Sequence, residues 1–338
     1  MDWLKQLKGN PLDWLLSSDV AGVRYLALRH LLDRPIADPQ LRQARAAAHR
    51  EGPIPAILAK MEPEGYWVRP GAGYNPKYRS AAWSVSLLAQ LGASTLEDER
   101  IGRACAYMLD HSLCPGGQFT TSGAPSGTID CLQGNLCWAL LELGCDDPRL
   151  KAAFEWMART ITGEGMAGAD EPAAPRRYYA YKCGPNFACG VNGEKPCAWG
   201  AAKEMLALGR LPEDWRTPLV KRAIRRGVEF LFSVELTGAD WPTRTDSAPN
   251  RSWWKFGFPV FYVTDLLQIA EALVGLGYGR DKRLRPLLAL IVEKQDQEGR
   301  WLLDYDYSGK TWVEFGVRRQ PNPWVTLRAL RVLKAAAA

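Results

Sequence analysis

Four cysteines in the middle of the chain have the residue type that zinc prefers, and two predicted helices can bring them together. Cys131 follows Asp130 at the start of one helix, Cys197 starts the next helix, and Cys183 and Cys189 lie in the loop between them. Zn²⁺ binds thiolates tetrahedrally, and a helix N-terminus lowers the pKa of a thiol. We therefore expect a zinc site made of four thiolates, or of three thiolates and a water molecule.

The spacing of these cysteines leaves a second interpretation open, in which they are small buried apolar residues. Cys183 and Cys189 are six positions apart, and Cys189 and Cys197 are eight apart, unlike the compact pairs of strong zinc motifs. A closed shell of four thiolates is structural, whereas a shell with an open position supports chemistry, and the sequence favours neither. We interpret the remaining cysteines as packing residues: Cys105, Cys114, Cys137 and Cys145.

A second set of residues has side chains that can act as acids or bases. Asp130 adjoins the predicted zinc ligands, and Asp265 lies in an otherwise apolar predicted helix, where a carboxylate needs a partner or a purpose. Tyr262 and Glu314 are further acid or base candidates. His111 ends a predicted outer helix, where it either caps that helix or acts as a general base. The alternative for the carboxylates is a structural ion pair between a loop and a helix.

Aromatic and basic residues in or near the long loops are our candidates for substrate binding. Aromatic rings can line a cavity, and cations can hold an anionic group, although most of the 14 Trp rings can equally pack the helices together. The candidates are Tyr78, Arg79, Trp199, Trp253, Lys255 and Arg318.

Two kinds of helix alternate along the chain and must position these residues. Helices that are apolar on nearly every side must be buried on most faces, whereas helices with one apolar stripe cover them. The first kind is predicted over 21–32, 80–91, 131–143, 197–208, 258–276 and 323–335, and the second over 2–16, 38–50, 98–111, 147–160, 217–233 and 281–295. Six inner and six outer helices follow from this alternation.

Long loops rich in Gly, Pro and aromatic residues precede the inner helices, and Leu-Gly pairs end four of them. Glycine in the left-handed conformation ends helices, so each pair marks the end of a repeat. All long loops should then lie at one rim, at the N-termini of the inner helices. Parallel helices direct partial positive charge to such a rim, which should attract anions.

Three of the long loops begin with a recurrent motif. Ile291, Gln295, Gly299 and Trp301 form an Ile-x3-Gln-x3-Gly-x-Trp pattern, and shorter versions occur at 64–67 and 116–119. Here the chain resembles the terpenoid cyclase and protein prenyltransferase superfamily over essentially its whole length, and most of all the bacterial proteins described only as prenyltransferase-like. The resemblance implies an all-α fold, an (α/α)6 toroid with long loops at one rim. A helical solenoid is the alternative.

The sequence departs from the catalytic motifs of that superfamily. Protein prenyltransferases hold zinc with an Asp-x-Cys arrangement and a distant His, whereas Asp130 and Cys131 are adjacent and His111 is the last histidine of the chain. The Asp-x-Asp-Asp motif of the cyclases is absent, and Asp304-Tyr305-Asp306 is the nearest run. The resemblance therefore implies the fold of that superfamily, whereas the residues that carry its reactions are not reproduced in this sequence.

Composition narrows the class of protein. The 338 residues, 47% of them hydrophobic, suit one domain over 1–338, and the net charge of +6 is scattered, which argues against nucleic acid as a partner. With no apolar window long enough for a membrane span and no secretion signal, we expect a cytoplasmic protein.

We expect a zinc-dependent hydrolase of a small anionic or ester-like substrate. The alternatives are an isoprenoid transferase or cyclase, and a noncatalytic ligand-binding toroid with structural zinc.

Overall fold

The computed structural model describes residues 2–168, 170–171, 173–174, 176–178 and 182–338, and this part of the chain is mainly α-helical. The strands are the two-residue pair β1 (Ala188–Cys189) and β2 (Lys195–Pro196), which are antiparallel. The predicted all-α class is confirmed. In this part of the chain, no helix has the length and the apolar composition that a membrane span requires.

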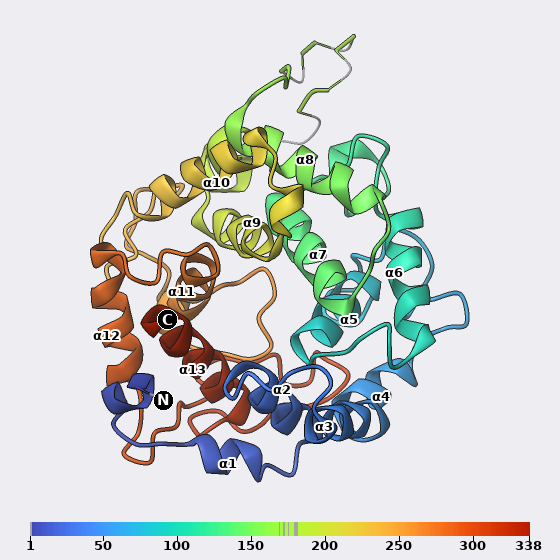
Figure 1. Ribbon diagram of the computed structural model, residues 1–338. Helices are drawn as coiled ribbons and strands as arrows, with labels where there is room; N and C mark the ends of the chain where they lie inside the picture. The colour runs from blue at the N-terminus through green and yellow to red at the C-terminus, as the bar shows by residue number, and fades with distance from the viewer. Residues whose placement is uncertain (1, 169, 172, 175, 179–181) are drawn as a thin grey trace.

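The inner helices are buried on nearly every side, as their composition predicts. In the helix that spans 81–90, every residue from Ala81 to Ala89 is buried. Figure 1 shows these helices arranged around a common centre. They are α2 (Ala21–His30), α5 (Ala81–Gln90), α7 (Asp130–Leu143), α9 (Ala198–Arg210), α11 (Leu266–Gly275) and α13 (Pro323–Ala337).

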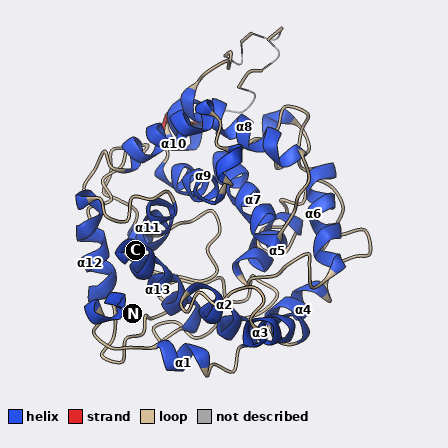
Figure 2. Ribbon diagram, in the orientation of Figure 1, coloured by secondary structure: helices blue, strands red, loops and turns tan. Residues whose placement is uncertain are grey.

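The outer helices bury one stripe each and lie around the inner set (Figure 2). In α10, for example, Val220, Ile224, Val228 and Leu231 are buried, at the spacing of one helix face. The outer helices are α1 (Leu12–Leu16), α3 (Pro39–Arg50), α4 (Pro53–Leu58), α6 (Glu99–His111), α8 (Arg149–Thr162), α10 (Pro218–Leu231) and α12 (Arg285–Glu293). Short 3-10 turns connect them: η1 (Asp2–Gln6), η2 (Pro125–Gly127), η3 (Pro185–Phe187), η4 (Gly190–Asn192), η5 (Glu213–Trp215), η6 (Arg251–Trp254) and η7 (Lys282–Leu284).

Neighbouring inner helices pack against each other in succession. Helix α5 contacts α7, α7 contacts α9, α9 contacts α11, α11 contacts α13, and α13 contacts α2. The end of α5 also meets α2, because a Cβ atom at Gly92 would lie 2.7 Å from Leu26 and 3.0 Å from Tyr25. Any side chain at position 92 would therefore push the first and second inner helices apart.

In the recurrent motif, the tryptophan holds the loop to the outer helix that precedes it, and the glycine packs against the next segment of the outer layer. The Trp301 indole donates a hydrogen bond to the Ile291 carbonyl (2.7 Å), and Trp67 does the same to Ile57 (2.9 Å). Gly299 has a φ of +86°, and a Cβ there would lie 2.1 Å from the carbonyl oxygen of Gly9. The last motif of the chain thus packs directly against the N-terminal segment.

Two predicted elements differ from the structure, and the outer helix α4 was not predicted. The helix predicted over 258–276 begins only at Leu266, because Pro259 lacks an N–H group and Asp265 caps the helix by accepting a hydrogen bond from the Gln268 amide (2.8 Å). The helix predicted over 2–16 is split into η1 and α1, with the turn Gly9-Asn10-Pro11 between them. Asp265 and Tyr262 therefore lie outside the helix in which we expected them.

Candidate functional site

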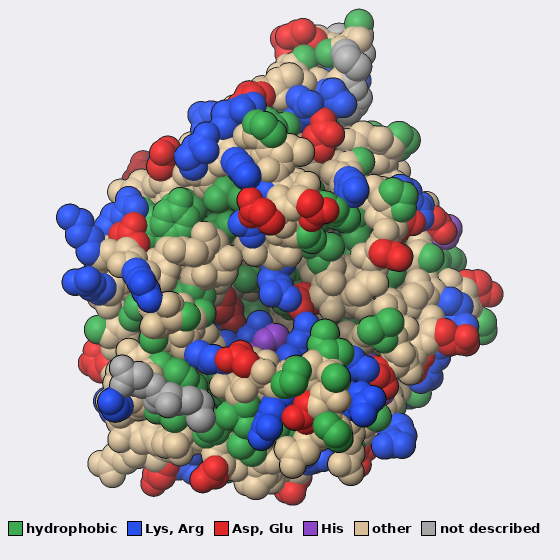
Figure 3. Space-filling view, viewed as in Figure 1, with side chains coloured by type: hydrophobic (Ala, Val, Ile, Leu, Met, Phe, Trp, Pro, Cys, Tyr) green, Lys and Arg blue, Asp and Glu red, His purple; other side chains and the backbone are tan. Residues whose placement is uncertain are grey.

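A cavity of about 450 Å³ lies where the inner helices converge. Each inner helix contributes residues from its C-terminal half, among them His30, Gln90, Glu142, Arg210 and Arg331. The six helices therefore run in the same direction and direct their C-termini to the cavity. Figure 3 shows the molecule hollowed at its centre on this face, with basic, acidic and histidine side chains in the hollow.

The opposite end of the inner helices, where we expected an anion to bind, is packed with aromatic rings. The Tyr78 ring lies 4.6 Å from Tyr307 and 5.4 Å from Trp83, and Phe261 lies 5.3 Å from Trp83. Asp265 and Asn322 cap the N-termini of α11 and α13 with their own side chains. The cavity found in the structure is thus at the other end of these helices.

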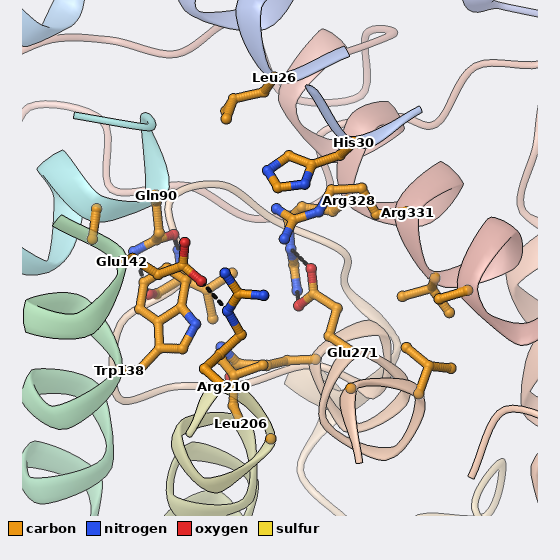
Figure 4. Close-up of a pocket in the computed structure, with 18 of the residues that line it drawn as sticks. Leu26, His30, Gln90, Trp138, Glu142, Leu206, Arg210, Glu271, Arg328 and Arg331 are labelled. Carbon is orange, nitrogen blue, oxygen red and sulfur yellow. Dashed lines mark hydrogen bonds and ion pairs between the residues drawn. The ribbon is translucent and has the colours of Figure 1, made fainter. Parts of the chain in front are cut away.

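The cavity has an apolar wall. Trp138, Leu206, Leu26, Val260 and Val274 line it. In Figure 4, the Trp138 ring lies across the cavity from the basic side chains of α13. A small molecule in this space would contact apolar surface on one side and charged groups on the other.

Arg328 is the most strongly held cation of the cavity. Its guanidinium donates to both Asp265 oxygens (2.9 and 3.0 Å), to both Glu271 oxygens (3.2 and 2.8 Å) and to the Gly257 carbonyl (2.8 Å). The side chains of Arg328 and Asp265 are only 8% and 4% exposed. Asp265 thus has the partner that we expected, but this partner is a cation of the last inner helix and not one of the loop.

Two more cations of the cavity are neutralised by carboxylates. Arg210 forms an ion pair with Glu142 across α9 and α7. Lys334 pairs with Asp33 (2.5 Å) and donates to the His30 carbonyl (2.9 Å). These contacts link neighbouring inner helices at their C-terminal ends and leave these cations little free charge.

Arg331 and Arg29 differ from the other cations of the cavity. Within the described residues, Arg331 has neither a hydrogen bond nor an ion pair, and Arg29 donates only to the Tyr25 hydroxyl (3.3 Å). Both side chains are half-buried. Glu142 and Glu271 interact electrostatically with the Arg331 charge, but among the described residues neither forms an ion pair with it, so no carboxylate takes up the N–H groups of Arg331.

His30 lies among these cations and is neutral at pH 7. Burial lowers its pKa well below 6.5, and the nearby charges of Arg331, Arg29, Arg210 and Lys334 lower it further. No hydrogen bond to its ring is present within the described residues. A neutral imidazole offers one N–H donor and one acceptor to a ligand.

Lys203 lies beside Gln268, which lines the cavity. The Lys203 ammonium donates to the Gln268 amide oxygen, which also accepts from the Thr264 hydroxyl (2.5 Å). Burial lowers the pKa of Lys203 to about 7. The same ammonium is close enough to Cys131 to affect the thiol electrostatically, so Lys203 lies between the cavity and the cysteines.

The structure brings the four predicted cysteine ligands to one region with Asp130. Asp130 and Cys131 begin α7, Cys197 immediately precedes α9, and Cys189 lies on β1. The Cys183 thiol lies beside the Asp130 carboxyl group, and Cys189 lies beside Cys197. The predicted convergence of these side chains is present.

The ionisation of this cluster differs from our expectation. Burial raises the pKa of Cys131 to about 12, and the hydrogen bond with Cys189 together with burial raises that of Cys197, so the helix N-termini do not give reactive thiolates here. Only Cys189 has a lowered pKa, about 6, because Cys197 and backbone amides donate to it. Burial also raises the pKa of Asp130 to about 8, and neither of its oxygens has a well-formed hydrogen bond.

The donor types of this cluster suit zinc, but the donors are not arranged around one point. Among the described residues, no three His, Cys, Asp or Glu side chains are grouped so that they would hold a metal ion. Cys189 instead pairs with Cys197, and Cys183 with Asp130, with the carboxyl group of Glu204 buried nearby. Zinc binding thus stays a prediction, and we derive no chemical step from it.

Three of the predicted aromatic site residues are neighbours at the long-loop end. Tyr78 donates to the Tyr262 hydroxyl (3.3 Å), and the Trp199 ring lies 6.4 Å from the Tyr262 ring. Lys77 lies 4.7 Å above Tyr262. Burial and the bond to Tyr262 raise the pKa of Tyr78, so it is not an effective base.

The other predicted residues lie apart from the cavity. His111 is exposed at the end of α6 and stacks on Tyr107, and Lys255 is exposed. Trp253 packs on Trp241 (4.8 Å) in the core. The remaining three stabilise loop 306–318: Arg79 donates to Gly309 and Thr311, Glu314 accepts from the Gly309 amide, and Arg318 binds Asp306.

Four residues that line the cavity were not among the predicted site residues: Arg29, His30, Arg210 and Arg331. A signal was present, because α2 and α9 each carry basic residues in their last turn. Cations commonly occupy the ends of surface helices, so this signal becomes informative only once those helices are placed inside the ring.

Comparisons with known proteins do not identify the site. No family model and no curated protein match the chain. A solved structure described as a protein from Actinoplanes is similar to it, with 15% identity over 87% of this chain and 100% of the other, and a TM-score of 0.31. A likeness this weak carries no argument about the function.

Proposed function

We propose that the protein is a single-domain (α/α)6 toroid that binds a small, partly apolar, anionic molecule in its central cavity. The toroid is supported by the succession of contacts between the inner helices and by the packing of Gly299 against Gly9. The observation that carries the binding function is the cavity itself, because it lies where all six inner helices meet.

The chemistry of the lining supports the class of ligand. The side chains that line the cavity include five Lys or Arg and three Asp or Glu, and Asp265, which is bound to Arg328, is a fourth carboxylate, so one positive charge is left over. Such a balance in a confined space favours an anion. The volume of about 450 Å³ is in the usual range for small-molecule sites.

Hydrolysis is the second candidate function, favoured by the group of thiols and Asp130 at the N-terminal ends of α7 and α9, which Lys203 connects to the cavity. Lys203 interacts electrostatically with Cys131 and hydrogen-bonds to Gln268 at the cavity. A zinc ion there would supply a Lewis acid and an activated water molecule. This candidate requires the cluster to close around the ion, which metal analysis tests.

We propose that the protein is located in the cytoplasm. All eight cysteines are free thiols, which is typical of proteins in a reducing compartment. The partner that we propose is a small molecule rather than a nucleic acid.

Blocking the cavity tests the proposed function. Leu206→Trp places a large ring in the cavity, whereas Leu219→Trp on the outer helix α10 is the matched control. We expect 3-phenylpropionate, a small aromatic acid, to bind the wild type and the control, and to bind Leu206→Trp at least 10-fold more weakly. Equal binding by all three proteins, or by none, would overturn the proposal.

A further inference from the structure

Some cations of the cavity form ion pairs with carboxylates and others do not. The cations without an ion pair point to a binding subsite. Arg328, Arg210 and Lys334 each have a carboxylate partner. Among the described residues, Arg331 forms no ion pair or hydrogen bond and interacts with Glu142 and Glu271 only electrostatically, and Arg29 has only the neutral Tyr25 hydroxyl. The excess positive charge of the cavity is therefore concentrated at two guanidinium groups, one on α13 and one on α2.

The helix dipole does not account for Arg331. The favourable effect of a cation at a helix C-terminus is confined to the last turn. Helix α13 continues to Ala337, and the basic residue of its last turn is Lys334. Arg331 thus lies beyond the reach of that effect and still points into the cavity, as Figure 4 shows.

His30 connects the two guanidinium groups. Both Arg331 and Arg29 lie close enough to lower its pKa. Its ring has no hydrogen-bond partner within the described residues and lines the same cavity. Two cationic donors and one neutral imidazole therefore surround one space.

We propose that Arg331, Arg29 and His30 form a subsite for a carboxylate group of the ligand, whose apolar part lies against Trp138 and Leu206. A guanidinium donates two parallel hydrogen bonds to a carboxylate, which is planar like itself. This inference rests on the proposed function, because it locates the charged end of the same ligand.

Competing charges favour a carboxylate over a more highly charged group. Glu142 and Glu271 line the same cavity, and each is already bound to an arginine. A polyphosphate carries several negative charges, and among the described residues only Arg331 and Arg29 of the cavity cations have no carboxylate ion pair and could meet them. A single carboxylate needs one guanidinium and leaves the other to a second acceptor of the ligand.

The test compares an acid with its neutral amide. We expect 3-phenylpropionate to bind the wild type at least 10-fold more tightly than 3-phenylpropionamide in titration calorimetry. Arg331→Gln should weaken binding of the acid 10- to 100-fold and leave binding of the amide unchanged. Arg225→Gln, at an exposed position of α10, is the matched control and should change neither.

Each result separates the subsite from the cavity. If the acid and the amide bind equally, and Leu206→Trp weakens both, the carboxylate subsite is wrong and the cavity stands. If phenyl phosphate binds more tightly than the acid, the class of the charged group is wrong. If neither the acid nor the amide binds, both proposals are wrong.

Two controls show whether Arg331→Gln acts by disturbing the fold: a second substitution in the subsite, and the thermal midpoint of the variant. Arg29→Gln, on a different helix, should weaken binding of the acid in the same direction. Because Arg331 has no partner to leave unpaired, Arg331→Gln should keep the thermal midpoint of the wild type. A lowered midpoint with unchanged affinity for the acid would show that Arg331 serves stability alone and would overturn the subsite.

Discussion

Replacement of Arg328 by methionine should destabilise the protein more than any other substitution in the cavity. The change leaves two carboxylates, Asp265 and Glu271, without the cation that makes five hydrogen bonds to them and to Gly257. Removing one partner of a buried ion pair costs about 3–5 kcal/mol. The exposed fractions of 8% for Arg328 and 4% for Asp265 place this pair in that class.

The assay is urea unfolding at pH 7, followed by tryptophan fluorescence. We expect Arg328→Met to lower the free energy of unfolding by about 3 kcal/mol or more. Arg283→Met is the control, because its ion pair with Asp281 is solvent-exposed, and it should change the free energy by less than about 1 kcal/mol. Adding Asp265→Asn should recover part of the loss, since it removes one buried charge. A loss for Arg328→Met as small as the control's would refute the assignment of this network as the main link among α11, α13 and the loop before α11.

Three further predictions concern the repeat motif, a buried amine and the cysteines. Trp301→Phe leaves the buried Ile291 carbonyl without its donor and should lower the free energy of unfolding by about 1–2 kcal/mol; no loss in urea unfolding would contradict the role of the motif. Lys203→Met should stabilise the protein, and by about 2 kcal/mol more at pH 7 than at pH 9, because the pKa of about 7 in the folded chain lies below the 10.5 of the unfolded chain and the wild type loses stability as the pH falls between these values; a gain independent of pH would contradict that pKa. Metal analysis should find zinc in the wild type and less in the double variant Cys131→Ser, Cys197→Ser, whereas equal zinc in both, or none in either, would exclude the predicted site.

Much of the fold follows from hydrophobic patterning, because the two layers bury different fractions of their surface. Segments without a polar face became inner helices with boundaries close to those predicted, as at 131–143 and 323–335. The prediction was wrong for 258–265, where an apolar run was taken for a helix. Apolar loop residues that fill the end of the ring cannot be told from an inner helix by composition alone.

The site could be predicted only in part. The convergence of Cys131 and Cys197 followed from their equivalent places at the starts of neighbouring inner helices. The cavity could not be predicted from the sequence, because its position depends on which end of the ring the aromatic residues of the loops fill. Arg331 and Arg29 are separated by some 300 residues, and nothing local marks either of them as facing the other.

The role of the central cavity is tested most directly by a crystal structure of the protein with 3-phenylpropionate. We expect the carboxylate within hydrogen-bonding distance of the Arg331 guanidinium and the phenyl ring against Trp138. Density for the acid at the aromatic end near Tyr78, or an unchanged cavity at a concentration that saturates binding in solution, would contradict the assignment.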